Sequence, residues 1–532
     1  MSVPALRLVS CAGSSKWPGR SVAIADILGI VSGIGVLRIA TLAAVACAAG
    51  ERADGQAAGH ETAAKAVQLS VVAVDNHGQP VGDLTAADFE IADAGKPEKI
   101  AIFRHSESVL QQAAPLAPGE FSNRAAANVP HATLVLFDLL NLNFSARSEA
   151  GSYLVEGLKS LESSDGLYLY LLTAEGKLVP VHPLPGAEDT APASGGVPWT
   201  KDAKTLVEGA LSKAFQLRPT FVDIGMRVRA TYAALQSTAS LMAGIPGRKD
   251  IVWVTRGVPI SLPATVTINH EPLDFAPILR KLCLMLDRVN VAVYPVMQIP
   301  PGMGGQGADE AEFGGVSSEE TLQQFAELTG GSTKSTNPIG TVVRQAMSDV
   351  RTSYQLGYYP PAENWDGKFH KLRVTCTRKG VRVQAKTGYY ALPEQASDEQ
   401  EALDAAVGPA YDASEIGLRC TMSPSAKGGG VMHFTLRIDP ANVRIAQQGD
   451  RYTGRLDLQM VGYLSSGAPQ RSAIAPLNLS WSAQELEQAR KDGLVWNQDI
   501  SVGTAAEKVR FLVFDRNSHA IGTLTIPLKP AK

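Results

Sequence analysis

Residues Thr133–Phe144 read TLVLFDLLNLNF and place one carboxylate, that of Asp138, at the end of an apolar run. The run contains the β-branched residues Thr133 and Val135, which favour a strand. In an open α/β sheet, an acid at the carboxyl end of a parallel strand stands where ligands bind. Aspartate is also common where a strand turns into a loop, so the stretch alone leaves both interpretations of Asp138 open.

The residues after His131 alternate between strand-like and helix-like stretches, as in an α/β domain. The short link AEGK between the second and third candidate strands suits a hairpin, which predicts one antiparallel edge strand on an otherwise parallel sheet. We therefore predict a doubly wound α/β domain over residues 131–351. The candidate strands read TLVLFD, GLYLYLLT, KLVPVHPL, DIVWVT and NVAVYPV. The candidate helices span residues 146–161, 201–215, 223–243, 274–289, 318–328 and 339–351.

Sequence of β character flanks this domain on both sides. Residues 66–105 and 352–392 each contain too few strands to bury a face alone, so we predict that they pair as two parts of one β unit. Residues 106–130 are rich in Ala and Pro and are interpreted as a linker. The number and spacing of strand-like stretches in residues 404–532 predict an immunoglobulin-like β-sandwich.

The composition excludes several classes of protein. The formal net charge is −3 and aromatic residues make up 6% of the chain, so the basic, aromatic footprint of a nucleic-acid-binding protein is missing. Five cysteines in 532 residues cannot form a disulfide framework. The nine histidines are scattered, with none at the spacing of a helical zinc site, which argues against a zinc enzyme.

Residues 1–65 are interpreted as an export signal or membrane anchor followed by a linker. Residues 27–50 are mostly apolar and long enough to cross a bilayer. Lys16 and Arg20 precede them and would stay in the cytoplasm by the positive-inside rule. The body of the protein is then exported and is periplasmic, extracellular or anchored in the cell envelope, and it contacts the membrane through this segment. Cleavage, lipidation at Cys47 and retention of the segment all stay open.

Several short phrases follow one another in a specific order: GQPVGDLTAADFEI, LVLFDLLN, AGIPGRKDIVWVTRGVP, VNVAVYPV, FAELTGG, and SYQLGYYPP with DGKFHKLRV. In this order they resemble the von Willebrand factor A domain superfamily, and more closely the VWFA-related proteins of the Acidobacteria type. The resemblance covers about residues 67–392. It implies a mostly parallel, six-stranded A domain inserted in or flanked by β-sandwich domains, and a role in binding proteins without catalysis.

The superfamily uses a metal-ion-dependent adhesion site, in which D-x-S-x-S, a loop Thr and a later Asp hold a divalent cation through oxygen atoms. The resemblance places Asp138 at the first Asp. Leu140 and Leu142 occupy the two Ser positions, and leucine has no ligand atom. Asn141 and Asn143 could offer amide oxygens only if the loop shifts by one residue.

The other positions of the site also depart from the pattern. Thr220 is the best match for the loop Thr, although a helix N-cap is the plainer interpretation. Thr255 and Arg256 end the strand DIVWVT, and Arg256 stands where the later Asp would be, which disfavours a cation. We therefore predict a degenerate site in which a salt bridge between Asp138 and Arg256 replaces the metal. No cofactor is predicted; a retained site would hold Mg²⁺ or Mn²⁺ at Asp138.

The main functional hypothesis is a non-enzymatic, exported protein of the adhesion type that binds a protein partner through strand-end loops. Two alternatives stay open: a structural scaffold of the cell envelope without a ligand, and a hydrolase that uses Asp138. A haloacid-type phosphatase would need a second Asp where Leu140 stands, and the sequence contains no G-x-S-x-G elbow. The candidate binding face consists of the glycine-rich loop 299–318 and of Asp138, Asn141, Asn143, Thr220, Thr255 and Arg256.

Overall fold

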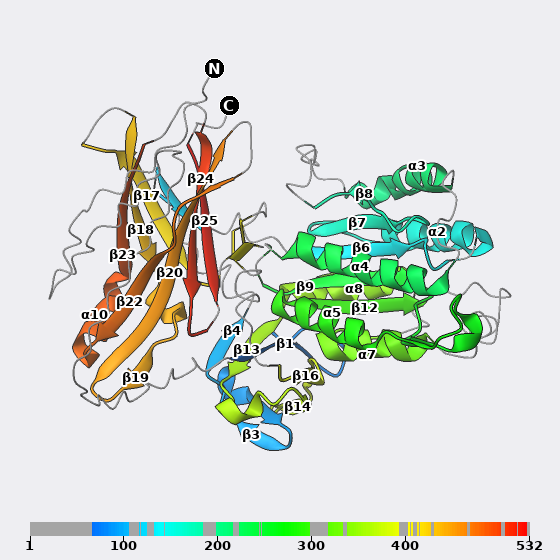
Figure 1. Ribbon diagram of the computed structural model, residues 1–532, viewed down its shortest axis with the longest axis horizontal. Helices are drawn as coiled ribbons and strands as arrows, with labels where there is room; N and C mark the ends of the chain where they lie inside the picture. Colours follow the sequence, from blue (N-terminus) through cyan, green and yellow to red (C-terminus); the bar gives the residue numbers. More distant parts are fainter. Residues whose placement is uncertain are drawn as a thin grey trace, which may run out of the picture.

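The computed structural model shows a body with a mixed sheet and helices, and two bodies built from antiparallel sheets (Figure 1). The predicted export signal in residues 1–65 lies outside the described residues. No helix in the described part of the chain is long and apolar enough to cross a membrane. The structure describes residues 66–528 except 106–115, 118, 125–131, 143, 185–197, 216–222, 244, 246, 298–317, 334–337, 393–402, 405, 408–411, 414, 427–429, 465–468, 502–505 and 519.

The mixed sheet has five strands. In spatial order they are β12 (Val291–Met297), β9 (Lys249–Thr255), β6 (Ala132–Asp138), β7 (Leu167–Leu172) and β8 (Leu178–His182). β12, β9, β6 and β7 are parallel, and β8 runs antiparallel to β7, as the hairpin link AEGK predicts. Every residue of β6, β7 and β9 is buried, which is the pattern of strands covered on both faces.

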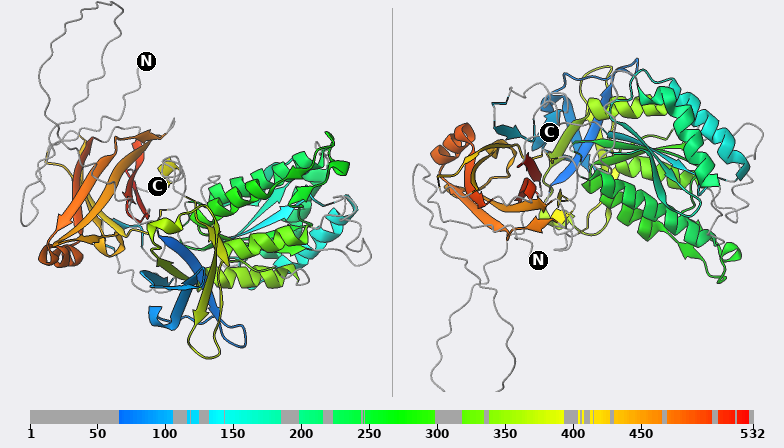
Figure 2. Two further views of the ribbon diagram at one scale, coloured as in Figure 1. Left: turned by 60° about the horizontal axis from the view of Figure 1, so that its bottom comes forward. Right: turned by 90° about the horizontal axis from the view of Figure 1, so that it is seen from above.

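Helices cover both faces of this sheet (Figure 2). One apolar core lies between the sheet and α4, α5 and α7, and a second lies between the sheet and α2, α3 and α8. α2 and α8 cross closely because both carry glycine at the crossing: a Cβ on Gly157 would lie 2.8 Å from the backbone nitrogen of Gly340. The helices are α2 (Phe144–Lys159), α3 (Ala203–Phe215), α4 (Ile224–Met242), α5 (Ala276–Arg288), α7 (Glu319–Thr329) and α8 (Ile339–Arg351).

The fold class predicted from the sequence is wrong. The sequence predicts a doubly wound, mostly parallel, six-stranded von Willebrand factor A domain. The described chain is mostly β, and five of its six sheets are antiparallel. The sheet with parallel pairs has five strands, because the chain does not return to it after α8. The next strand, β13 (Tyr354–Tyr358), pairs instead with β1 (Val67–Val74) in another sheet.

Two segments far apart in the sequence form the first antiparallel body, the β unit. Its sheets have the orders β15-β1-β13-β4 and β16-β14-β2-β3, so strands before the five-stranded sheet pair with strands after it. This pairing is the one that we expected for residues 66–105 and 352–392, and one apolar core joins the two segments. The remaining strands are β2 (Phe89–Asp93), β3 (Lys96–Glu98), β4 (Ile102–His105), β14 (Phe369–Cys376), β15 (Arg382–Gln384) and β16 (Gly388–Tyr390).

The second antiparallel body, at the C-terminus, has two sheets that share one core. One has the order β23-β18-β17-β5, and the other has the order β19-β20-β24-β25, with β21 and β22 also on β20. β5 (Glu120–Ser122) corrects the interpretation of residues 106–130 as a linker, because it pairs with β17. The other elements are β17 (Leu418–Pro424), β18 (Val431–Ile438), β19 (Ala446–Gln448), β20 (Arg451–Leu464), β21 (Gln470–Arg471), β22 (Ala475–Trp481), α10 (Ala483–Asp492), β23 (Leu494–Ser501), β24 (Ala506–Asp515) and β25 (Ile521–Pro527).

The β unit contacts the five-stranded body at the amino ends of its parallel strands. Asn290, just before β12, donates through Nδ2 to Oε1 of Gln355 at 3.0 Å. The ammonium group of Lys386 lies 2.6 Å from Oδ1 of Asp287 at the end of α5. The parallel strands point away from these contacts, so their carboxyl ends lie at the opposite side of the body (Figure 1).

Candidate functional site

The carboxylate of Asp138 is saturated by protein donors at the end of β6. Its Oδ1 accepts from the backbone N–H of Asn141 at 3.1 Å. Its Oδ2 accepts from Nδ2 of Asn141 at 2.7 Å, Oγ1 of Thr255 at 2.7 Å and Nε1 of Trp253 at 3.2 Å. The side chain is 0% exposed. Burial raises the pKa of Asp138, and the bonds from Asn141, Thr255 and Trp253 oppose that rise.

The sheet and α4 position these donors. β6 and β9 are neighbours, so the end of β9 lies beside Asp138, and Trp253 and Thr255 stand two residues apart on one face of β9. Oγ1 of Thr255 also accepts from the backbone N–H of Gly257 at 2.8 Å, which fixes the turn after the strand. Nδ2 of Asn141 also donates to Oγ1 of Thr231 in α4 at 2.9 Å. The carboxylate thus ties two strand ends to a helix.

The residues at this position do not fit a divalent cation. Mg²⁺ and Mn²⁺ need several oxygen ligands, whereas N–H groups of Asn141 and Trp253 point at the carboxylate. Leu140 and Leu142 are buried in the two apolar cores on opposite faces of the sheet. A small movement of the loop therefore cannot bring a ligand atom into either position. Within the described ranges, no three His, Cys, Asp or Glu side chains are grouped so that they could hold a metal.

In isothermal titration calorimetry, we expect the purified protein to show no binding of Mg²⁺ or Mn²⁺ with a dissociation constant in the micromolar range, on the order of the 0.1–10 μM of calcium sensor sites. A cation would have to displace the N–H donors of Asn141 and Trp253 from the carboxylate of Asp138. Arg256→Asp should not create binding, because Leu140 and Leu142 still supply no oxygen. Stoichiometric binding that Asp138→Ala abolishes would contradict this expectation.

The other predicted site residues are brought together only in part. Asp138, Asn141 and Thr255 meet, but the salt bridge between Asp138 and Arg256 is not among the described contacts of the carboxylate, which are those to Asn141, Trp253 and Thr255. The backbone carbonyl of Arg256 accepts from Oγ of Ser318 at 2.8 Å. Asn143, Thr220 and residues 299–317 lie outside the described residues.

Sequence reasoning missed three polar residues of this region. Trp253 and Thr231 bind Asp138 and Asn141, and the position of Trp253 two residues before Thr255 was the signal that could have found it. The N-cap of α4 is Asp223, whose Oδ1 accepts from the backbone N–H of Met226 at 2.7 Å. The N-cap interpretation of Thr220 is therefore corrected in favour of Asp223.

The described residues give little support to a hydrolase. The carboxylate of Asp138 has no exposed surface for a substrate to reach. In β18, Nδ1 of His433 lies 2.8 Å from Oδ1 of Asp499, and Oγ1 of Thr435 lies 3.4 Å from Nε2 of His433. These three residues stand in the sequence of contacts of a catalytic triad: carboxylate, imidazole, hydroxyl. The Thr435 hydroxyl, however, donates to Oδ1 of Asn497 at 2.8 Å and therefore does not donate to the imidazole.

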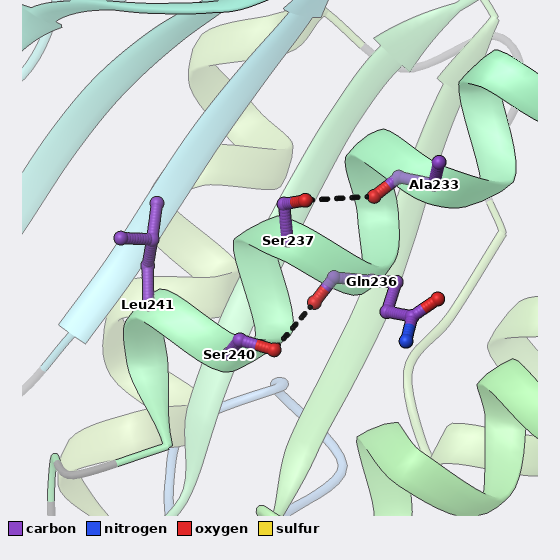
Figure 3. A pocket seen from close by; sticks show the side chains of 5 residues that line it. All are labelled: Ala233, Gln236, Ser237, Ser240 and Leu241. Carbon is purple, nitrogen blue, oxygen red and sulfur yellow. Dashed lines mark hydrogen bonds between the residues drawn. The ribbon is translucent and has the colours of Figure 1, made fainter. Parts of the chain in front are cut away.

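Two hollows on the five-stranded body are lined by few or no titratable side chains. The larger, of about 500 Å³, lies on the outer face of α4, where Ser237 and Ser240 donate to backbone carbonyls of the same helix (Figure 3). None of its lining residues is titratable. The second, of about 380 Å³, lies between β8 and α3, and Lys213 is the one charged residue in its lining. Neither contains a pair of groups for acid–base or nucleophilic chemistry.

A well-anchored excursion after β9 extends the carboxyl-end surface. β10 (Ser261–Leu262) and β11 (Leu273–Asp274) pair at its base, and Leu262 is buried. Leu273 packs against the start of α4, since a Cβ on Gly225 would lie 2.7 Å from its side chain. Oγ1 of Thr267 donates to the carbonyl of Glu271 at 2.7 Å and fixes the tip.

The tip of this excursion exposes one large apolar side chain. Ile268 is 65% exposed, the largest fraction among the exposed large apolar side chains of the described residues. It follows Thr267, which is buried and hydrogen-bonded, so the backbone under Ile268 is held in place. The body therefore presents an ordered apolar anchor at the end of the sheet that faces away from the β unit.

No model of a known protein family matches the sequence, and no curated relative matches it. Among solved structures, proximal thread matrix protein 1 from the mussel byssus is similar at 12% sequence identity and a TM-score of 0.22. The match covers 43% of this chain and 48% of that protein, so this chain spans about half of its length. The similarity is too low to carry an argument about function.

Proposed function

We propose that the protein is a non-enzymatic, exported binding protein that engages a protein partner at the carboxyl-end surface of its five-stranded sheet. The surface comprises the strand end at Asp138, the loop at Thr255 and Arg256, and the excursion that carries Ile268. Contact with the partner uses no metal in this proposal, because N–H groups of Asn141 and Trp253 already bind the carboxylate of Asp138.

The observation that carries the proposal is the anchored, exposed Ile268. A large apolar side chain on an ordered backbone loses little conformational entropy on binding, which is the property of an interface anchor. The surface around it lies opposite the contacts to the β unit (Figure 1). The saturated carboxylate of Asp138 stiffens the strand ends beneath that surface.

The test uses the full chain, purified and immobilised, to capture proteins from cell-envelope extracts of the source organism. Ile268→Glu should reduce recovery of a specific, stoichiometric partner at least tenfold, because it places a charge in an apolar contact worth about 2 kcal/mol. Ile474→Glu is the matched control, since Ile474 is 41% exposed on the C-terminal body. It should leave recovery unchanged.

The alternative, a structural scaffold of the cell envelope without a ligand, predicts a different outcome. In that case the wild type, Ile268→Glu and Ile474→Glu would recover the same proteins in the same amounts. Equal recovery would therefore overturn the binding proposal, provided that all three proteins have the same thermal unfolding temperature.

A further inference from the structure

The outer face of β14 and β16 presents an aromatic pair to solvent. Phe369, in β14, is 43% exposed. It stands directly across from Tyr390, in β16, and the two rings meet edge to face with their centroids 5.2 Å apart. A Cβ on Gly388 would lie 2.2 Å from Cζ of Phe369, so the Phe369 ring lies over this glycine. The exposed ring is therefore packed in one place on the sheet.

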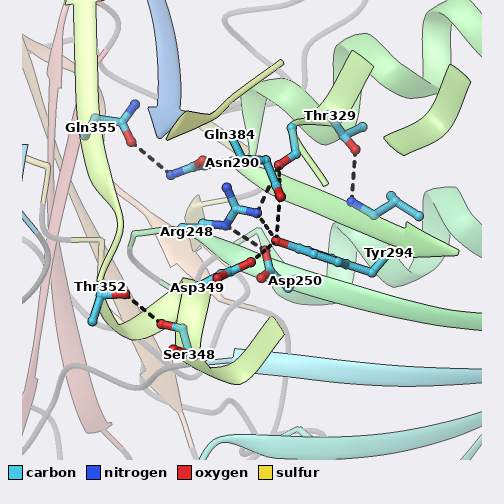
Figure 4. Close-up of polar contacts among 12 residues, drawn as sticks. Arg248, Asp250, Asn290, Tyr294, Thr329, Ser348, Asp349, Thr352, Gln355 and Gln384 are labelled. Carbon is cyan, nitrogen blue, oxygen red and sulfur yellow. Dashed lines mark hydrogen bonds and ion pairs between the residues drawn. The ribbon is translucent and has the colours of Figure 1, made fainter. Parts of the chain in front are cut away.

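The five-stranded body contributes a cation to this aromatic pair. The guanidinium carbon of Arg280, in α5, lies 5.6 Å from the centroid of the Tyr390 ring, which is a cation–π contact. Hydrogen bonds hold the two bodies together beside it. Gln384, in β15, donates through Nε2 to the hydroxyl of Tyr294 at 3.2 Å (Figure 4) and to the carbonyl of Gly330 at 3.1 Å. Arg280 is thus kept next to the aromatic pair.

Two basic side chains continue the face along β14. Successive side chains of a strand alternate between its faces, so Phe369, Lys371 and Arg373 point to the same side at intervals of about 7 Å. All three are exposed. Neither Lys371 nor Arg373 forms an ion pair with a residue in the described part of the chain. The face therefore offers an apolar ring followed by two available positive charges in a row.

The carboxylates near this face lie at its margins. Glu90, in β2, accepts from Oγ1 of Thr375 at 3.4 Å, one position beyond the row of basic side chains. Glu327, in α7, accepts from a glutamine of its own helix at 2.7 Å. Lys368 and Asp366 pair with each other at 3.4 Å and add no net charge. The middle of the face is consequently positively charged.

We propose that this face is a docking surface for an acidic, extended segment of a partner protein. An extended segment also places every second side chain on one side, at the same interval of about 7 Å. An apolar side chain over Phe369 then sets acidic side chains, two and four positions away, opposite Lys371 and Arg373. The face belongs mainly to the β unit and is separate from the carboxyl-end surface of the five-stranded body.

The chemistry of the face favours a protein partner over an acidic polysaccharide. Sugar hydroxyls both donate and accept hydrogen bonds, whereas Lys371 and Arg373 only donate and the ring of Phe369 does neither. The next exposed side chain of β14, Thr375, already donates to Glu90. An apolar side chain flanked by carboxylates matches an apolar ring flanked by cations.

The test is a saturation-transfer NMR titration of the full chain with two peptides of the same length, composition and charge. The in-register peptide has a central phenylalanine, glutamates two and four positions away on either side, and threonine elsewhere, so it reads the same in both directions. The out-of-register peptide has its glutamates one and three positions away, which puts them on the side opposite the phenylalanine. The in-register peptide should bind on the order of tenfold more tightly, because it alone forms two ion pairs.

Variants of the face should change this binding in a specific way. The double variant Lys371→Glu/Arg373→Glu should weaken binding of the in-register peptide about tenfold and should bind a peptide with lysines in place of the glutamates. Phe369→Ser should weaken binding of both glutamate peptides. Arg382→Glu is the matched control, because Arg382 is exposed in β15, in the other sheet of the β unit. Ile268→Glu should also leave peptide binding unchanged, so this proposal and the one for the carboxyl-end surface can fail separately.

Three outcomes overturn the proposal. The first is equal affinity of the wild type for the two glutamate peptides, a comparison that decides alone if a variant does not fold. The second is no saturable binding of the in-register peptide below about 1 mM. The third is tighter binding of an acidic polysaccharide, polygalacturonate, that the double variant loses, because the face would then take a polysaccharide and not a protein.

Discussion

Replacing Gly331 with alanine is expected to abolish stable folding of the five-stranded body. A Cβ at this position would lie 1.9 Å from the carbonyl oxygen of Val293 and 2.6 Å from its carbonyl carbon. Both atoms belong to the backbone of β12 and cannot rotate away as a side chain can. Oγ1 of Thr329 accepts from the backbone N–H of Val293 at 2.9 Å, so the end of α7 is held against that strand. The expected loss is more than about 4 kcal/mol.

Differential scanning calorimetry of the full chain measures this loss as the disappearance, or a large downward shift, of one unfolding transition. The matched control is Gly209→Ala in α3, where nothing lies within 4 Å of the new Cβ. That change should stabilise the body slightly, by about 0.5–1 kcal/mol, because alanine favours the helix. Similar transitions for Gly331→Ala and wild type would show that β12 and α7 can separate at little cost.

Local patterns in the sequence predicted the positions of the strands of the five-stranded sheet better than they predicted how many strands the sheet has. The buried run at Ala132–Asp138 and the link before β8 are local signals, and both correspond to elements of the structure. Membership in a sheet is not local. Tyr354–Tyr358 has a strand pattern, but only its pairing with β1, about 280 residues earlier in the chain, shows which sheet it joins. The prediction of a six-stranded domain was wrong for this reason.

The candidate site shows the same division between local and non-local information. Asp138 and Thr255 were found because both end apolar strands that were expected to be parallel. The salt bridge to Arg256 was predicted from charge alone, and the described donors to the carboxylate are instead Asn141, Trp253 and Thr255. Asn141 closes a short turn back onto the carboxylate, and Trp253 reaches it from the neighbouring strand. Such contacts depend on side-chain direction at the strand ends, which hydrophobic periodicity does not specify.

The carboxylate of Asp93 binds three side chains inside the β unit. Its Oδ2 accepts from the hydroxyl of Tyr358 at 2.9 Å and from that of Tyr389 at 3.0 Å. Its Oδ1 lies 3.1 Å from Nδ1 of His370. Asp93 ends β2, in the segment before the five-stranded body, whereas its three partners follow that body in sequence. The carboxylate therefore joins the two halves of the β unit across the insertion.

Asp93→Ala is expected to destabilise the β unit by about 3–5 kcal/mol, because it leaves the hydroxyl groups of Tyr358 and Tyr389 without their buried acceptor. Exchange of backbone amides in β1 and β13, measured by mass spectrometry on the full chain, should accelerate more than 100-fold, whereas amides of β20 and β24 should be unaffected. Asp366→Ala is the matched control, because Asp366 contacts the other ring nitrogen of His370 at 3.2 Å and its side chain is 32% exposed. It should change the exchange rates little, because exposed ion pairs contribute little to stability. Equal exchange rates for Asp93→Ala and Asp366→Ala would mean that the apolar core, and not this carboxylate, holds the two halves of the β unit together.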